Sequence, residues 1–467
     1  MEKIVLGLFL IINIAFADNQ TADLTPILVD EPLPFDISIE LAGFTLPQGI
    51  QSAAAAQHKG KYLFIAGRIN GLHGFDPGDN NFPPDEQNTT VFVIDPYAQT
   101  VATRSLYDPS SGLTQAQIDS LSVTACQFYQ KGNTLYITGG YGVDTATGNF
   151  STKDILSAIN VSGLMHWATH PECACTASEY IRQISNPVFQ VTGGHMSQFG
   201  KNPTLLMFGQ NFDGFYTPSS TGDYTYQVRR FYILDNGTSL GVEVLNPAEA
   251  DSSYRRRDLN VAPIVKIKNK EKLAAFVALS GVFTPSNGVW TVPVDIAANG
   301  YTHIADPSLA TTFKQGMNNY ICPHVELLSK SGNNYIILFG GITYEFFQNG
   351  EFLSDPELPF TNQVTIVKRN KRGAFTQYLS PNQYPIIAST GSNPGNTLLF
   401  GASGQFMPVP GVPTYTNGVI NLAQIACPTI IGYIIGGIQS TLPNTFSPSD
   451  SAASPYVFKV ILTPRRT

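Results

Sequence analysis

The densest group of metal-ligating side chains in this sequence is a run of two histidines and two cysteines, His166-x3-His170-x2-Cys173-x-Cys175. Zinc sites use His nitrogen and Cys thiolate ligands that short spacings bring together. The single residue between the two cysteines differs from the usual two-residue spacing, and Pro171 stiffens the middle of the run. We therefore interpret the segment as an ordinary loop or a disulfide, with metal binding as the alternative. We assign no metal site and no cofactor.

Polar and aromatic side chains gather in three loop-like segments, residues 68–89, 141–153 and 210–224. Aromatic rings offer a large contact area at low entropy cost, so Tyr, Phe and Asn beside glycine suit carbohydrate or peptide ligands. A plain solvated loop is the alternative for each single residue. The predicted ligand-binding residues are Arg68, His73, Tyr141, Phe212 and Tyr216.

The overall charge is mildly acidic. The chain has 27 Lys and Arg against 34 Asp and Glu, a net charge of -7. This balance disfavours nucleic acid or an anionic membrane surface as the main partner. The one dense basic run is Arg255-Arg256-Arg257. We interpret it as a solvated loop and not as a phosphate site.

The elements that position these residues are visible as a repeat. A β-rich apolar run ending in glycine returns six times, at 63–67, 135–140, 205–209, 276–281, 335–341 and 433–437. A short strand and a polar turn precede the run, and a hairpin follows it in several copies. Such a four-stranded unit buries both of its faces only when units stack around an axis. The sequence therefore predicts an all-β fold, a β-propeller of six blades, with a seventh blade inside residues 378–425 as the competing count.

The two ends of the chain are predicted to close the propeller together. Residues 36–42 alternate apolar and polar side chains and have no blade of their own. We expect them to form the outermost strand of the last blade, beside residues 456–462 as its third strand, because this pairing removes an exposed edge. Buried structural thiols are expected on three innermost strands, at Cys126, Cys322 and Cys427.

The order of strand, polar turn, aliphatic run, Gly-Gly, long loop and hairpin resembles kelch repeats. Residues 135–140 and 335–341 match the kelch core best, and the resemblance runs unevenly from about residue 36 to the end. Gln210 and Val282 follow the glycine of the third and fourth units. We interpret these two units as degenerate, lacking the second glycine of the pair.

The regular scaffold, the aromatic loops and the lack of a complete catalytic constellation favour a binding module that takes a protein or glycan ligand on its rim loops. The kelch resemblance implies an alternative, a sugar-modifying enzyme such as a sialic acid mutarotase-like isomerase, with acid/base and arginine groups at the channel mouth. The candidate catalytic residues for that alternative are His195, His324, Arg68 and Arg256. The sequence does not decide between module and enzyme, and a purely structural surface component is a third possibility.

The first seventeen residues have the pattern of a secretory signal. Lys3 precedes an apolar stretch at 4–14, and Ala15-Phe16-Ala17 provides a cleavage pattern. The apolar stretch is shorter than the ~20 residues of a spanning helix. We predict a signal peptide at 1–17, an N-terminal linker at 18–35 and a kelch-like β-propeller at 36–467. The chain is expected to be secreted or periplasmic, with no transmembrane segment after signal cleavage.

Overall fold

The computed structural model describes residues 27–28, 32–74, 80–217, 220–445 and 447–465. The predicted signal peptide at 1–17 lies outside these residues, as does most of the linker at 18–35. None of the helices in the described ranges is long and apolar enough to cross a membrane.

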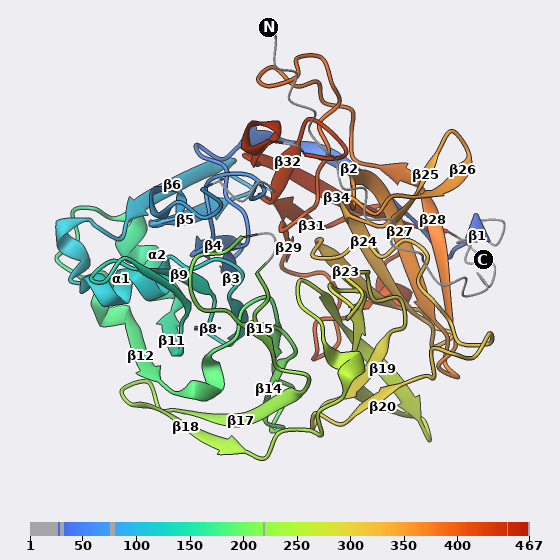
Figure 1. The fold of residues 1–467 in the computed structure, drawn as a ribbon, viewed down its shortest axis with the longest axis horizontal. Coiled ribbons are helices and arrows are strands. Elements are labelled where there is room, and N and C mark those ends of the chain that lie inside the picture. Colours follow the sequence, from blue (N-terminus) through green and yellow to red (C-terminus); the bar gives the residue numbers. More distant parts are fainter. Residues whose placement is uncertain (1–26, 29–31, 75–79, 218–219, 446, 466–467) are drawn as a thin grey trace, which may run out of the picture.

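In the described residues six blades, each built on four antiparallel strands, stand around a central axis (Figure 1). From the innermost strand outward, the first three blades are β3 (Ala54–His58), β4 (Lys61–Ile65), β5 (Thr90–Asp95) and β6 (Thr100–Ser105); β7 (Gln127–Lys131), β8 (Thr134–Thr138), β11 (Ile155–Asn160) and β12 (Ile181–Ser185); and β13 (His195–Ser197), β14 (Thr204–Met207), β17 (Val228–Asp235) and β18 (Leu240–Leu245). The last three are β19 (Asn260–Lys268), β20 (Glu271–Leu279), β21 (Val294–Ala297) and β22 (Thr302–Ile304); β23 (His324–Leu328), β24 (Asn334–Ile342), β27 (Phe360–Arg369) and β28 (Phe375–Gln383); and β29 (Gln405–Pro408), β31 (Thr429–Ile435), β34 (Tyr456–Pro464) and β2 (Phe35–Thr45). The predicted all-β propeller with six blades is confirmed.

The last blade contains both ends of the propeller, as predicted. Its outermost strand β2 pairs antiparallel with β34, with Ile37 opposite Leu462 and Ile39 opposite Val460. Two short strands extend the fifth blade, where β1 (Ile27–Leu28) pairs with β28 and β30 (Ile420–Asn421) pairs with β23, both in parallel. The closure therefore joins the N-terminal and C-terminal strands within one sheet, which leaves no unpaired edge between them.

The remaining elements are hairpins and short helices inserted between blade strands. Four blades carry a two-stranded hairpin between their second and third strands: β9 (Tyr141–Asp144) with β10 (Asn149–Thr152), β15 (Gln210–Asn211) with β16 (Asp223–Tyr224), β25 (Glu345–Gln348) with β26 (Glu351–Ser354), and β32 (Ile438–Ser440) with β33 (Ser451–Ala453). The α-helices are α1 (Gln115–Leu121) and α2 (Val161–Thr169). The 3-10 helices are η1 (Pro84–Glu86), η2 (Pro109–Ser111), η3 (Ala177–Tyr180), η4 (Pro187–Phe189), η5 (Ser252–Tyr254), η6 (Leu422–Gln424) and η7 (Pro448–Asp450).

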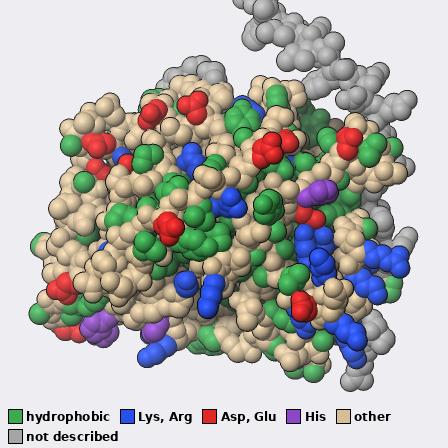
Figure 2. Space-filling view, turned by 90° about the horizontal axis from the view of Figure 1, so that it is seen from below, with side chains coloured by type: hydrophobic (Ala, Val, Ile, Leu, Met, Phe, Trp, Pro, Cys, Tyr) green, Lys and Arg blue, Asp and Glu red, His purple; other side chains and the backbone are tan. Residues whose placement is uncertain are grey.

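The core is a set of apolar layers between neighbouring blades. One buried cluster lies at each of the six blade interfaces; between the second and third blades it contains Tyr136, Leu156, Leu206 and Phe231. Both faces of a blade are thus covered by its neighbours, which is how a thin sheet becomes stable here. A side view shows charged side chains scattered over a mostly uncharged outer surface (Figure 2).

At the end of each second strand the backbone lies so close to another segment of the same or the next blade that glycine is required there. In all six blades two consecutive residues with positive φ stand at this end of the strand, and the second is always glycine: Ala66-Gly67, Gly139-Gly140, Phe208-Gly209, Ser280-Gly281, Gly340-Gly341 and Gly436-Gly437. In the fifth blade the pair lies within β24, and in the other five blades it directly follows the strand. A Cβ on Gly67 would lie 2.3 Å from the carbonyl oxygen of Gln51. Our interpretation of the third and fourth units is therefore wrong. They keep the second glycine, and Phe208 and Ser280 take the place of the first.

The segment proposed as a seventh blade and one of the thiols lie elsewhere than expected. Residues 397–401 form no blade; the Phe400 carbonyl instead accepts a hydrogen bond of 2.9 Å from the Gly341 N–H, which ties the fifth blade to the sixth. Cys126 directly precedes the innermost strand β7, and Cys322 lies two residues before the innermost strand β23. Cys427 is exposed, and its placement on an innermost strand is wrong because β29 forms the inner strand of that blade.

Candidate functional site

Loops from all six blades line one cavity of about 760 Å³ at an end of the propeller axis. The lining comes from two places in each repeat: the connection between the second and third strands, and the segment that leads into the innermost strand. These are the parts of the repeat that differ most in length and side-chain type, whereas the strands themselves are occupied with packing. The cavity is of the size that binding sites for small molecules have.

The segments leading into the innermost strands form a ring where the cavity meets the central channel. One residue of each has a left-handed φ between 47° and 67°: Ser52, Ala125, Gly193, Asp258, Ile321 and Ser403. Four neighbouring pairs are joined by backbone hydrogen bonds of 2.7–3.1 Å, each from the N–H of one blade to the carbonyl of the preceding one. All six residues line the cavity. These hydrogen bonds fix the positions of neighbouring cavity walls relative to one another.

Three arginines line the cavity against two carboxylates, Asp258 and Glu357. Arg257 forms an ion pair of 3.0 Å with Asp258, and its Nε donates a hydrogen bond of 3.1 Å to the Tyr224 hydroxyl. Burial alone would lower the pKa of Arg257, but the nearby carboxylate and tyrosines raise it above its ordinary value. Burial raises the pKa of Asp258, and the charge of Arg257 opposes that shift. Arg257 therefore stays charged at any physiological pH.

The other two arginines have no ion pair with a carboxylate of the described residues. The Arg68 side chain is 2 % exposed, and it donates hydrogen bonds to Asn70 Oδ1 at 2.9 Å and to the Pro83 carbonyl at 3.2 Å. Burial lowers the pKa of Arg68 to about 10, so it remains charged at neutral pH. Arg255 lies 4.1 Å over the Tyr224 ring and donates to the Phe283 and Thr284 carbonyls. In a chain of net charge -7, this cavity has a local excess of positive charge.

An aromatic wall stands beside these charges. The rings of His73 and Tyr216 lie 4.9 Å apart, those of Phe82 and Tyr141 5.4 Å, and those of Phe212 and Tyr216 5.5 Å. The Tyr141 hydroxyl donates a hydrogen bond of 2.7 Å to the Gly214 carbonyl, which fixes its ring. Burial lowers the pKa of His73 to about 4, and the charges of Arg257 and Arg68 contribute to this shift. His73 is therefore neutral at pH 7.

Buried polar atoms without a partner lie in the same lining. Asn81 is 2 % exposed and donates from Nδ2 to the Tyr216 carbonyl at 3.2 Å, while its Oδ1 accepts no hydrogen bond from the described residues. The same holds for Oδ1 of Asn444. A buried acceptor without a donor costs free energy unless a ligand or water supplies one. These atoms are consistent with hydrogen bonding to a ligand.

The structure brings all five predicted ligand-binding residues, Arg68, His73, Tyr141, Phe212 and Tyr216, into the lining of this cavity. Whether they contact a ligand stays a prediction. The lining also includes residues that were not among the predicted ligand-binding residues: Phe82, Tyr224, Arg255, Arg257, Asp258, Phe283 and Tyr320.

The four candidate catalytic residues are not brought together. Arg68 lines the cavity, whereas His195 and His324 begin the inner strands β13 and β23 and are not in the lining. Burial, with a smaller effect of His324, lowers the pKa of His195 to about 3. His324 Nδ1 lies 2.5 Å from Glu326 Oε1. These two histidines therefore lie on inner strands, close enough for the charge of His324 to act on His195, and outside the cavity lining.

Arg256 is fully buried and points away from the cavity. Its guanidinium donates hydrogen bonds of 2.8–3.2 Å to three backbone carbonyls, those of Ser253, Ser280 and Val292, and lies 4.8 Å over the Trp290 ring. The interpretation of residues 255–257 as a solvated loop is wrong. Because an extended segment alternates its side chains, Arg255 and Arg257 face the cavity and Arg256 faces the blade core.

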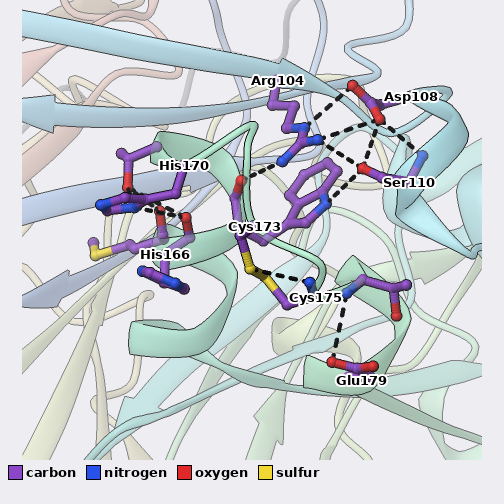
Figure 3. The surroundings of a disulfide bond; sticks show 12 residues. Arg104, Asp108, Ser110, His166, His170, Cys173, Cys175 and Glu179 are labelled. Atoms are coloured by element: carbon purple, nitrogen blue, oxygen red, sulfur yellow. Dashed lines mark hydrogen bonds and ion pairs between the residues drawn. A yellow bond between two sulfur atoms is a disulfide. The ribbon is translucent and has the colours of Figure 1, made fainter.

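The His/Cys run forms a separate feature, remote from the cavity lining. Cys173 and Cys175 are joined by a disulfide, in line with the disulfide interpretation of the run. The same two sulfurs and a ring nitrogen of His166 all lie within 4.8 Å of one another. Figure 3 shows this group at the end of helix α2.

No family model matches this chain. No curated protein matches it either. Among solved structures, the chain is similar to one described as "Structure of YjhT", with 11% sequence identity over 90% of this chain and 99% of that chain and a TM-score of 0.46. A likeness at this level carries no argument about function.

Proposed function

We propose that this chain is a kelch-like propeller whose function is to bind an anionic glycan, or the end of one, in the cavity on its axis. The observation that carries the proposal is the combination of Arg68, Arg255 and Arg257 with an aromatic wall inside one cavity of about 760 Å³. The kelch assignment is supported by four-stranded antiparallel blades whose second strands end in a glycine pair or its variant.

A glycan fits this site better than a protein surface does. Protein interfaces are broad and fairly flat, whereas this cavity is concave and of small-molecule size. Aromatic faces stack on sugar rings, and the guanidinium fork pairs with carboxylates. The unpartnered Oδ1 of Asn81 offers an acceptor to a sugar hydroxyl. Each side chain type that a carboxylated sugar needs is therefore present in the lining.

We further propose that the chain is exported, with a signal peptide at 1–17, a linker at 18–35 and the propeller from residue 36 onward, and is secreted or periplasmic. The apolar start and Ala15-Phe16-Ala17 support this proposal. The disulfide Cys173–Cys175 is also typical of an oxidising compartment. Expression with the natural leader, followed by N-terminal sequencing of the exported product, tests it; a product still carrying residues 1–17 would contradict it.

The test of ligand binding is an array of neutral and carboxylated glycans probed with the chain from Asp18 onward. We expect saturable binding to carboxylated glycans, reduced roughly tenfold or more by Arg255→Gln, because a charge-assisted hydrogen bond contributes about 1.5–3 kcal/mol. Arg255 suits the test because its removal leaves no carboxylate unpaired. Arg372→Gln, an exposed arginine, is the matched control and leaves binding unchanged. Equal binding of neutral and carboxylated glycans would overturn the proposal.

A sugar-modifying isomerase is the second candidate, and Asp258 favours it. Its carboxyl lines the cavity, and burial raises its pKa toward the range that suits a general acid or base. His73, neutral at pH 7, lines the same cavity. If the chain is such an enzyme, Asp258→Asn abolishes anomer interconversion of the bound sugar, followed by NMR, and retains binding. Interconversion at the uncatalysed rate in the wild-type chain would exclude this candidate.

A further inference from the structure

The last turn of helix α2 and the loop after it hold three metal-ligating side chains close enough together for one metal ion to contact all of them. They are His166 in the last turn of the helix and Cys173 and Cys175 in the loop, and their ligand atoms all lie within 4.8 Å of one another. In a tetrahedral zinc site with metal–sulfur bonds of about 2.3 Å, two sulfurs stand about 3.8 Å apart. The three ligand atoms are therefore close enough together for one Zn²⁺ to contact all of them once the disulfide is open.

Helix α2 is a fixed platform for His166. The Asn160 side chain caps its N-terminus by accepting a hydrogen bond of 2.9 Å from the Gly163 N–H. Trp167 is fully buried, and the Arg104 guanidinium lies 4.5 Å over its ring and donates a hydrogen bond of 2.6 Å to its carbonyl. The helix is thus anchored on the first blade while its exposed face presents His166.

Backbone hydrogen bonds hold the loop and the Cys173 sulfur in place. The Cys175 N–H donates a hydrogen bond of 3.0 Å to Cys173 Sγ, and the Cys173 N–H donates one of 3.0 Å to the His170 carbonyl. An N–H bond to sulfur stabilises negative charge there. The nearby C-terminal end of α2 carries partial negative charge, which favours a cation beside it. These contacts fix the positions of the two cysteines relative to the end of helix α2.

His166 is the better histidine ligand of the two in this segment. Its ring makes no hydrogen bond that the described residues provide. The His170 ring stands 4.2 Å from it, but Nδ1 of His170 already contacts the Thr169 hydroxyl at 2.9 Å and the His166 carbonyl at 3.1 Å. The structure therefore supplies three ligands, His166, Cys173 and Cys175, and solvent supplies the fourth.

We propose that reduction of the Cys173–Cys175 disulfide creates a binding site for one thiophilic divalent cation, such as Zn²⁺, at His166, Cys173 and Cys175. A dithiol reductant transfers two electrons to the disulfide; the reductant becomes a cyclic disulfide and the chain gains two thiols. Zn²⁺ then binds the two sulfurs and the His166 nitrogen, and the two thiol protons are released to solvent. The loop has two forms, an oxidised disulfide and a reduced metal site.

The experiment titrates Co²⁺ into a Cys427→Ser chain, because Cys427 is the exposed free thiol. The chain is divided into an untreated portion and a portion reduced with a dithiol and desalted under anaerobic conditions. We expect a near-ultraviolet thiolate-to-cobalt absorption at one Co²⁺ per chain in the reduced portion alone, abolished by added Zn²⁺. The same spectrum in both portions, or no such band in either, would overturn the proposal, and this comparison needs no site variant to fold.

Variants then assign the ligands. Cys173→Ser and Cys175→Ser each remove the absorption band, and His166→Gln weakens Co²⁺ binding roughly tenfold or more. His170→Gln is the matched control, from the adjacent exposed ring, and leaves the Co²⁺ affinity unchanged. A band that survives in Cys173→Ser, or an equal loss of affinity in His170→Gln and His166→Gln, would contradict the ligand set. Far-ultraviolet circular dichroism verifies that each variant keeps the fold.

Discussion

The second glycine of each blade makes a sharp stability prediction, tested by Gly67→Ala. Gly67 has φ of +88°, and a Cβ there would lie 2.3 Å from the Gln51 carbonyl oxygen and 3.0 Å from Ala53 Cα, both of them backbone atoms that cannot rotate away. The Gly67 N–H also donates a hydrogen bond of 2.8 Å to the Val123 carbonyl in the next blade. Any shift that relieves the clash therefore strains the contact between two blades.

The magnitude follows from comparison with a glycine that has the same φ and open space. Gly237 has φ of +89°, and a Cβ there meets nothing within 4 Å. Ala in the left-handed region costs about 1–2 kcal/mol at both positions, offset by about 0.4–1 kcal/mol from the less flexible unfolded chain. At Gly67 the crowding adds about 1–3 kcal/mol and the weakened buried hydrogen bond adds about 1 kcal/mol more. We expect Gly67→Ala to lower the free energy of unfolding by about 2–4 kcal/mol more than Gly237→Ala.

Urea unfolding followed by circular dichroism measures this difference, with the two variants and the wild-type chain compared under one set of conditions. The midpoint of Gly67→Ala falls well below that of Gly237→Ala, with similar slopes. Equal midpoints for the two variants would refute the argument that close approach, and not φ alone, requires glycine at the second position. The neighbouring Ala66, at φ of 62°, shows that a left-handed residue with a Cβ is tolerated at the first position.

Three further outcomes are expected from buried groups. Burial lowers the pKa of His73 to about 4 from 6.5, so the stability that neutral His73 contributes is complete above pH 6.5 and is lost as the pH falls toward 4. The loss is at most about 1.4 kcal/mol per pH unit. In His73→Gln the urea midpoint should therefore depend less on pH over this range than in the wild-type chain. Arg256→Met leaves two buried carbonyls and one partly buried carbonyl unpaired and should lower the free energy of unfolding by roughly 3 kcal/mol or more, and an unchanged urea midpoint would contradict this role. Iodoacetamide should label Cys427 in the native chain and reach Cys126 and Cys322 only on unfolding, because burial raises the pKa of both to about 12; mass spectrometry of timed samples gives the order.

The fold could be predicted because the same pattern of apolar residues and glycine returns once in each blade of the sequence. The glycine-ended runs mark second strands, and the alternating residues 36–42 and the apolar residues 456–462 mark the closing pair. Alignment within the repeat was harder. Phe208 and Ser280 occupy the first, left-handed position of the pair, where glycine is expected. The sequence pattern therefore indicated, wrongly, that the second glycine of the pair was missing.

The site was half visible for a similar reason. Loops between second and third strands contain conspicuous aromatic and charged residues, and these were singled out. The segments leading into the inner strands share only a backbone conformation: Ser52, Ala125, Gly193, Ile321 and Ser403 have no side chain property in common. No composition signal finds them. The interpretation of residues 255–257 as a solvated loop is wrong because it gives all three arginines the same exposure. In an extended segment successive side chains point to opposite sides.

The six residues of the ring, one from each segment that leads into an innermost strand, make the two sides of the cavity chemically different. Six blades place six equivalent backbone positions around the axis, and of these only the fourth carries an ionisable side chain, Asp258. Arg257, next to it in the chain, and Arg255 come from the same lead-in segment, so two of the three arginines of the cavity belong to the fourth blade. Arg68 and the aromatic wall stand on loops of the first three blades, with Arg68 4.9 Å over the Phe82 ring. A ligand with one anionic group and an uncharged body can satisfy both sides in a single orientation. The nearly symmetric scaffold thus fixes the positions of these residues, and the departure from symmetry at the fourth blade would orient the anionic group of the proposed glycan toward Arg255 and Arg257.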